Sequence, residues 1–183
     1  MKTRSIHGGD FGDTELLSGE RVSKSDIRID TLGELDELQS VLGLIRSLDK
    51  QSSIKKLIRS IQDDLRVIMG EIAGGRIEIS TTDSLNQEMI ERLDNETLKY
   101  REKVDQPKGF ITPGDDLYST LFDLARTVTR RVERRVVYAQ LQQVIQNELI
   151  LKYLNRLSTL MFFVELFEIK QSKNIRSIRN HIV

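Results

Sequence analysis

Residues 125–138 read A-R-T-V-T-R-R-V-E-R-R-V-V-Y, a stretch in which apolar and cationic side chains recur with the period of an α-helix. The apolar spacing begins upstream of this stretch and continues through it. The positions concerned are Leu117, Leu121, Leu124, Val128, Val132 and Val136. One face of this helix is therefore predicted to pack into a core.

Charged side chains share another face of the same helix: Arg126, Arg130, Glu133 and Arg134. Guanidinium groups bind phosphate oxygens in a forked, planar geometry that lysine does not offer. Two interpretations stay open on this segment alone. The face either binds a negatively charged ligand or is a solvated surface with internal ion pairs, such as one between Arg130 and Glu133.

The rest of the chain mostly follows the same helical spacing. Helices are predicted at about 26 or 30–48, 52–73, 82 or 83–104, from beyond Pro113-Gly114, and at about 146–170. Their predicted inward side chains are Leu35, Leu38, Leu42, Ile45, Ile54, Leu57, Ile58, Ile61, Leu65, Ile68, Met69, Ile150, Leu154, Leu157, Met161 and Val164. Gly74-Gly75 would end the second helix, and residues 76–80 are predicted to form a loop or a helix end rather than a strand.

Five helices joined by short loops predict an all-α protein, an antiparallel five-helix bundle that forms one domain over residues 1–183. Residues 1–25 are polar and less regular, and they are predicted to form an N-terminal loop. Residues 26–172 would form the bundle. Residues 173–183 would form a C-terminal tail that is solvated or packed onto the bundle.

The composition excludes several classes of protein. The chain has no cysteine, which rules out disulfides, cysteine zinc sites, iron–sulfur clusters and thiol nucleophiles. Its two histidines, His7 and His181, lie near the ends, so neither a Glu-x-x-His di-iron site nor a histidine-based triad is supported. The net charge is zero and no apolar run is long enough for a membrane helix. We expect a cytoplasmic protein that binds neither nucleic acid nor membrane.

The N-terminal segment contains a glycine-rich run, G-G-D-F-G-D-T, at residues 8–14. Glycines allow backbone N–H groups to curl around an anion, so the run is either an anion-binding loop or a flexible leader. Lys24 and Arg28 add cationic groups before the first helix, and ordinary surface charge is the alternative interpretation.

Three further residues are candidates for specific roles. Asp36 lies between Leu35 and Leu38, where a carboxylate near the core would need an arginine partner, and the arginine helix could supply it. Phe110 precedes a Pro-Gly turn and is either a loop plug or a functional group. Asn155 interrupts an apolar helix, which predicts a specific partner, whether a helix-to-helix hydrogen bond or a ligand.

Six segments, in this order, resemble the PduO-type ATP:cob(I)alamin adenosyltransferases almost end to end. They are G-D-F-G-D-T (9–14), R-V-S-K-S-D-I-R (21–28), G-E-L-D-E-L (33–38), F-I-T-P-G (110–114), A-R-T-V-T-R-R-V-E-R (125–134) and Y-L-N-R-L-S (153–158). The arginine segment and N-R-L-S are the most specific of them.

This resemblance implies a ferritin-like, cobalamin adenosyltransferase-like bundle that assembles as a homotrimer, with ATP between the N-terminal loop of one subunit and the arginine helix of another. The implied nucleotide-binding residues are His7, Gly8, Gly9, Asp10, Thr14, Lys24, Arg130, Arg131, Glu133, Arg134 and Asn155. The implied catalytic residues are Arg130, Phe110 and the subunit-bridging pair Asp36 and Arg126. Phe110 and Phe162 would contact the corrinoid.

The implied reaction transfers the 5′-deoxyadenosyl group of ATP to the cobalt of cob(I)alamin, giving adenosylcobalamin and triphosphate with the help of Mg²⁺. Reduced cobalt is itself the nucleophile, so the protein needs no histidine base and no thiol. The implied partners are ATP, a corrinoid, other copies of the chain, and an adenosylcobalamin-dependent mutase or a flavoprotein reductase.

The sequence departs from the family pattern at three places. Ile6-His7-Gly8 stands where Thr-Lys-Thr is usual, Asp115 replaces the last glycine of Pro-Gly-Gly, and Thr159 replaces the aspartate after N-R-L-S. A non-catalytic relative that stores or delivers corrinoid or nucleotide is therefore an alternative. A helical module that docks nucleic acid is a third hypothesis, and the zero net charge argues against it.

Overall fold

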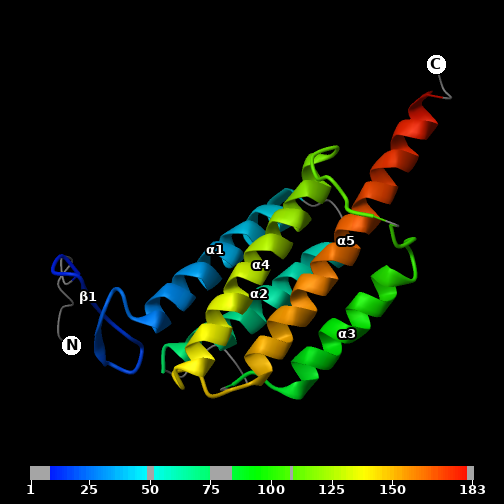
Figure 1. Ribbon diagram of the computed structural model, residues 1–183. Coiled ribbons are helices and arrows are strands. Elements are labelled where there is room, and N and C mark those ends of the chain that lie inside the picture. Colours follow the sequence, from blue (N-terminus) through cyan, green and yellow to red (C-terminus); the bar gives the residue numbers. More distant parts are fainter. Residues whose placement is uncertain (1–8, 49–51, 75–83, 108, 181–183) are drawn as a thin grey trace.

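The computed structural model describes residues 9–48, 52–74, 84–107 and 109–180, and their side chains as far as Ser172. These residues form a small antiparallel hairpin followed by five helices (Figure 1). The elements are β1 (Asp13–Glu15), β2 (Arg21–Ser23), α1 (Ile27–Leu48), α2 (Ser52–Ile72), α3 (Gln87–Arg101), α4 (Leu117–Leu141) and α5 (Leu149–Asn180). The predicted five helices are confirmed, whereas the hairpin was not expected.

The bundle is built around α4 and α5. α4 packs against α1 on one side and α5 on the other, α3 packs against α5, and α2 packs against α1 (Figure 1). The inward side chains predicted for the first, second and fifth helices are buried, except Met69, which is partly buried. Helical periodicity therefore identified the core correctly for these three helices.

The predicted apolar stripe of α4 needs a correction at its N-terminal end. Leu121 and the three valines are buried, but Leu117 is 71% exposed and Leu124 is 43% exposed. The buried arc of α4 is centred on Ala125 and Val132, so these two leucines fall at its edge.

The hairpin is held by its own turn and by α2. The Leu16 N–H donates to the Glu20 carbonyl at 2.9 Å, and Gly19 closes the turn with a φ of +84°, which glycine adopts without strain. The Ser18 N–H donates to the Ala73 carbonyl at the end of α2, at 3.3 Å. Two apolar residues of the hairpin, Leu16 and Val22, are buried.

Arg28, in the first turn of α1, ties the hairpin to the bundle. Its guanidinium donates to Glu20 at 2.7 Å and to Asp26 at 2.8 Å. The Arg28 charge is thus compensated by neighbouring carboxylates, which favours the ordinary structural interpretation of this residue over an anion-binding one.

Helix ends follow the capping residues. The Asn86 side chain accepts from the Met89 N–H, so α3 begins later than predicted, and the Asp116 side chain accepts from the Ser119 N–H just beyond Pro113-Gly114, as predicted. α5 continues to Asn180, so the predicted end near residue 170 is wrong. Residues 171–180 contain neither glycine nor proline, and nothing local stops the helix.

The ion pair between Arg92 and Asp64 has a buried carboxylate. Asp64 of α2 is 3% exposed and accepts hydrogen bonds from Arg92 of α3 and from the Tyr153 hydroxyl of α5, the latter at 2.7 Å. Burial raises the pKa of the Asp64 carboxyl, and the two hydrogen bonds offset part of that rise. Three helices are therefore joined through one carboxylate.

In the described part of the chain, no helix combines the length and the apolarity that a bilayer crossing requires. The segment 76–80, predicted to be a loop or a helix end, lies outside the described residues.

Candidate functional site

The five arginines of α4 fall into two groups according to their partners. Arg126 pairs with Asp123 on the same helix, and Arg131 and Arg135 pair with carboxylates of α1. Arg130 and Arg134 are exposed, and within the described part of the chain no ion pair or hydrogen bond engages either guanidinium. Arg130 and Arg134 are therefore the two arginines of the predicted anion-binding face whose charge no carboxylate of the described chain compensates.

Arg131 was predicted to contact the nucleotide. In the structure its guanidinium donates to Glu37 and lies 4.0 Å from Glu34, both on α1. Its charge is therefore used within the chain to hold α4 against α1. The alternative of an ion pair between Arg130 and Glu133 is not found among the described residues.

Glu133 and Asn155 connect α4 to α5 next to the two uncompensated arginines. The Asn155 side-chain amide nitrogen donates to the Glu133 carboxylate at 3.1 Å, and the Arg156 guanidinium donates to the Asn155 Oδ1 at 3.1 Å. The Arg156 guanidinium lies 3.0 Å from the Asp94 carboxylate of α3. The specific partner predicted for Asn155 is thus a helix-to-helix hydrogen bond, and the amide itself stays exposed.

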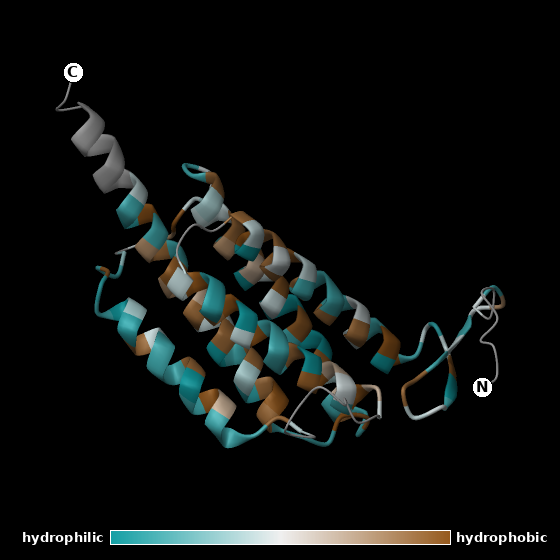
Figure 2. Ribbon diagram, turned by 180° about the vertical axis from the view of Figure 1, so that it is seen from behind, coloured by the Kyte–Doolittle hydropathy of each residue, from teal (hydrophilic) through white to brown (hydrophobic). Residues whose placement is uncertain are grey.

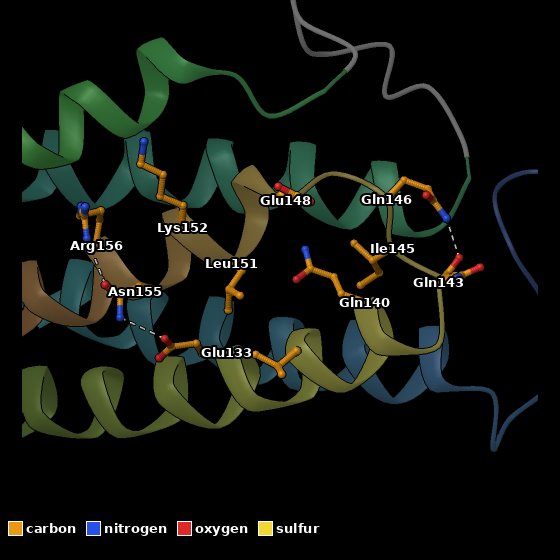
Figure 3. Close-up of a pocket in the computed structure, with 11 residues that line it drawn as sticks. Glu133, Gln140, Gln143, Ile145, Gln146, Glu148, Leu151, Lys152, Asn155 and Arg156 are labelled. Carbon is orange, nitrogen blue, oxygen red and sulfur yellow. Dashed lines mark hydrogen bonds between the residues drawn. The ribbon is translucent and has the colours of Figure 1, made fainter.

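These residues border a cavity of about 670 Å³ between the C-terminal end of α4 and the N-terminal end of α5 (Figure 3). Val137, Ile145 and Leu151 supply apolar wall, while Gln140 and Lys152 supply amide and ammonium groups. Such a mixture suits a ligand with a flat apolar part and a polar edge. The uncompensated arginines lie on the helix that forms one wall.

The N-terminal loop brings Lys24 onto the glycine run. The Lys24 N–H donates to the Gly12 carbonyl at 2.7 Å, and the Lys24 ammonium lies so close to Gly9 that a side chain there would come within 3.1 Å of it. Gly12 adopts a φ of +84°, which favours glycine. Asp10 and Thr14 belong to the same loop and hairpin. His7 and Gly8 lie outside the described residues.

A single chain does not bring this loop to the arginines. In Figure 1 the hairpin projects beyond the N-terminal end of α1, whereas Arg130 lies half-way along α4. Among the described residues no hydrogen bond or ion pair joins Lys24 to Arg130, Glu133 or Asn155. The predicted nucleotide site is therefore divided into two halves that one copy leaves apart.

Asp36 is placed differently from the prediction. Its side chain is exposed rather than close to the core, and it lines a small cavity between α1 and α2 together with Arg59 and Arg66. No ion pair joins Asp36 to Arg126 within the described chain. The carboxylates of α1 that do meet α4 arginines are Asp30, Glu34 and Glu37.

The two predicted corrinoid contacts differ in exposure. Phe110 is fully exposed in the loop before α4, at the opposite end of the bundle from the hairpin (Figure 1). The interpretation of Phe110 as a loop plug is therefore wrong. Phe162 on α5 is half-buried and packs edge-to-face on Phe163, with ring centroids 5.5 Å apart.

The sequence was compared with known proteins. A family model described as Cobalamin adenosyltransferase matches residues 5–168. The chain is 36% identical to a corrinoid adenosyltransferase of Bacillus subtilis over 160 residues, which are 84% of this chain and 80% of the relative. It is 31% identical to one of Citrobacter freundii over 155 residues, 84% of this chain and 88% of the relative. The chain belongs to the cobalamin adenosyltransferase family.

Solved structures agree with this cobalamin adenosyltransferase assignment. A phenylalanine-to-alanine variant of a PduO-type ATP:corrinoid adenosyltransferase from Lactobacillus reuteri, complexed with cobalamin and ATP, has a TM-score of 0.79 and 27% identity, covering 93% of this chain and 96% of that one. An arginine-to-lysine variant from the same organism, complexed with ATP, also has a TM-score of 0.79, at 28% identity over 92% and 95% of the two chains. The predicted resemblance is confirmed.

Sequence reasoning missed one acidic residue of this cobalamin adenosyltransferase. Glu165 of α5 is 2% exposed and lies near the Asp123–Arg126 pair of α4. Burial raises the pKa of Glu165 to about 7, with a further rise from Asp123 and an opposing effect of Arg126. Its only sequence signal is a glutamate inside the apolar run F-F-V-E-L-F.

Glu165→Gln is expected to stabilise the fold above pH 7. The Glu165 pKa is 4.5 in its unperturbed state and about 7 in the fold, so between these values the native state keeps a proton that the unfolded state has lost. Stability therefore falls as pH rises through this window, and the cost above it is about 3 kcal/mol. Urea unfolding of the wild type and the variant at about pH 4 and about pH 8 measures it. A gain that is equal at both pH values would contradict the assignment, and the exposed Glu102→Gln is the control.

Proposed function

We propose that the protein transfers the 5′-deoxyadenosyl group of ATP to the cobalt of cob(I)alamin, releasing triphosphate. One observation carries the proposal. Three arginines of α4 pair with carboxylates of their own chain, whereas Arg130 and Arg134 are exposed and have no carboxylate partner in the described part of the chain. Both lie on the same helix as Glu133, which borders the cavity together with Asn155. The family membership and the relatives complexed with cobalamin and ATP support the same reaction.

The reaction requires the protein only to bind both substrates and to stabilise negative charge on the leaving group. The electron pair of reduced cobalt attacks the 5′ carbon of ATP, a cobalt–carbon bond forms, and the carbon–oxygen bond to the triphosphate breaks. Negative charge accumulates on the leaving triphosphate in the transition state. Arg130 and Arg134 stabilise that charge, because preorganised cations aimed at developing charge are the largest common source of catalysis. No proton has to be moved by a side chain.

Mg²⁺ fits this arrangement as an ion carried by the nucleotide. Among the described residues no cluster of three acidic or histidine side chains could hold a metal alone. Mg²⁺ usually takes one or two carboxylates together with substrate phosphates and water. Glu133 is the carboxylate next to the uncompensated arginines, and it would supply the protein ligand.

The complete site forms between copies of the chain, with the Gly9–Thr14 loop and Lys24 of one copy meeting the arginines of the next. Exposed apolar side chains support such an assembly. The ion pairs from α4 to α1 set an antiparallel register that brings four exposed leucines to one end of this helix pair: Leu44, Leu48, Leu117 and Leu124. Exposed apolar side chains gathered at one end of a helix pair are typical of a protein–protein contact. A homotrimer, with Asp36 of one copy bridging to Arg126 of another, is the assembly that we propose.

Phe110 provides the apolar contact for the corrinoid. Its ring is fully exposed, and an exposed aromatic in a loop costs solubility unless something covers it. Against the lower face of the corrin, the ring would exclude a lower ligand from cobalt and make reduction easier. Phe162 would contribute a second aromatic contact.

The adenosylation assay tests this function. The purified protein is incubated with ATP, Mg²⁺ and cobalamin under a strong reductant, and the absorption spectrum is followed. Formation of adenosylcobalamin and stoichiometric triphosphate is expected. Binding of both substrates without product would instead favour the non-catalytic storage or delivery hypothesis, and no binding of either would reject both. A cytoplasmic location and a partnership with a mutase or a flavoprotein reductase stay predictions.

Phe110→Ala is expected to lower turnover at least about tenfold while ATP affinity stays unchanged, because the aromatic acts on the corrinoid and not on the nucleotide. Steady-state kinetics with each substrate varied separately, together with ATP calorimetry, measures the two effects. The exposed aromatic Phe11→Ala is an unsuitable control because it lies in the nucleotide loop, so Tyr138→Ala, which is 52% exposed on α4, serves instead. A Phe110→Ala enzyme with full turnover would remove Phe110 from this role.

A further inference from the structure

A second cavity, of about 430 Å³, lies between α2 and α3. α2 packs chiefly on α1 and α3 chiefly on α5, and the two helices make little contact with each other, which leaves the groove open between them. It shares no lining residue with the cavity between α4 and α5. In Figure 2, α3 is the most uniformly hydrophilic helix of the bundle.

Both helices present one polar face to this groove. α2 contributes Ser53, Lys56 and Ser60, which recur with helical spacing, and α3 and the residues after it contribute a matching row. That row consists of Arg92, Glu96, Lys99, Tyr100 and Lys103. Four cationic side chains and one carboxylate therefore line the groove.

The positive charge of the groove is only partly neutralised. Lys99 donates to Glu96 at 2.6 Å, and Arg92 donates to the buried Asp64. Within the described segments no ion pair engages Lys56 or Lys103. The ammonium groups of Lys56 and Lys103 are therefore available to bind an anion.

Arg92 and Lys103 are held in place before any ligand arrives. Arg92 is anchored through Asp64, which Tyr153 also contacts, yet the Arg92 side chain is 42% exposed, so a ligand in the groove can reach it. The Lys103 ammonium lies 5.3 Å from the Tyr100 ring centre and 5.4 Å from that of Phe167, a cation–π arrangement. Preorganised donors lose little entropy when they bind a ligand.

We propose that the groove between α2 and α3 is a second anion site, which binds a phosphate-bearing small molecule through Lys56, Arg92 and Lys103. Phosphate oxygens can accept from several donors at once, and the hydroxyl of Ser53, which also lines the cavity, adds a further polar group. The volume accommodates more than one phosphate group. The inference does not depend on the adenosyltransferase reaction.

Calorimetric titration with inorganic tripolyphosphate and, separately, inorganic phosphate tests the site. The titration uses an Arg130→Ala, Arg134→Ala background, so that the α4 arginines do not contribute. Lys56→Gln with Lys103→Gln is expected to weaken binding at least about tenfold at physiological salt. Hydrogen exchange should show ligand protection in residues 53–60 and 92–103.

The control pair is Lys55→Gln with Arg101→Gln, which removes two charges from the same two helices at exposed positions outside the groove. The control should leave affinity within about twofold. Equal weakening by both pairs would mean diffuse attraction and would overturn the proposal, as would the absence of saturable binding. Tighter binding of tripolyphosphate than of phosphate supports a polyphosphate or nucleotide ligand, and equal binding supports a single phosphate group.

Discussion

Arg130→Ala should lower kcat/KM for adenosyl transfer by about 10²–10³, the loss typical of removing one preorganised charge donor to a transition state. Arg130 is exposed on α4, and within the described residues its guanidinium has no carboxylate partner that the substitution would strand. The fold should therefore stay intact. The effect should fall mainly on kcat, because charge on the triphosphate grows as the carbon–oxygen bond breaks.

Arg135→Ala is the matched control for this prediction. Arg135 stands on the same helix, one residue past the predicted site, and its guanidinium lies 3.3 Å from Glu34 and 3.7 Å from Asp30. Its removal costs a surface ion pair worth at most about 1 kcal/mol and should leave turnover unchanged. Equal losses of turnover in both variants would mean that the α4 arginines affect activity by stabilising the fold and not by contacting the substrate. Full activity of Arg130→Ala would remove it from catalysis.

Arg92→Ala should lower the free energy of unfolding by about 3 kcal/mol or more, because it leaves the Asp64 carboxylate buried without its cationic partner. Asp64 is 3% exposed, and the Tyr153 hydroxyl alone would remain as its hydrogen-bond donor. Without the arginine, Asp64 should take up a proton more readily. The loss should consequently shrink as the pH is lowered and the carboxyl becomes neutral.

Urea denaturation at constant protein concentration measures this loss, since assembly also contributes to apparent stability. Arg59→Ala is the control: Arg59 pairs with Asp63 on the same helix at 3.3 Å, but both side chains are about half exposed. Its effect should stay below about 1 kcal/mol. If the two variants were equally stable, the Asp64 network would not contribute as described.

The helical core was predictable because apolar periodicity reports burial directly. Leu35 and Leu157, for example, follow from spacing alone, and both are fully buried. The edge of a buried arc is less predictable: Leu117 and Leu124 fit the stripe but face outward, since the arc centre depends on where neighbouring helices lie. The hairpin was missed because each of its strands has three residues, too few for an alternating pattern.

The candidate site shows what sequence order leaves undecided. The arginine cluster was evident from the sequence. Which of its arginines form ion pairs with α1, however, depends on the register between α4 and α1. That register commits Arg131 to Glu37 and leaves Arg130 without a partner among the described residues. Asp36 was expected near the core from its leucine neighbours, yet helical geometry places it on the exposed α1–α2 side. Glu165 carried no motif at all.

Subunit complementation tests the central proposal. In that proposal, ATP binds between the Gly9–Thr14 loop and Lys24 of one copy and the exposed α4 arginines, Arg130 and Arg134, of another copy. Lys24→Ala and Arg130→Ala, each poorly active alone, are co-expressed with different tags and the mixed assemblies are purified. Each mixed trimer has one interface in three with both halves intact, so about a third of the wild-type activity should return. Mixed assemblies no more active than the two parent variants would contradict a site shared between copies.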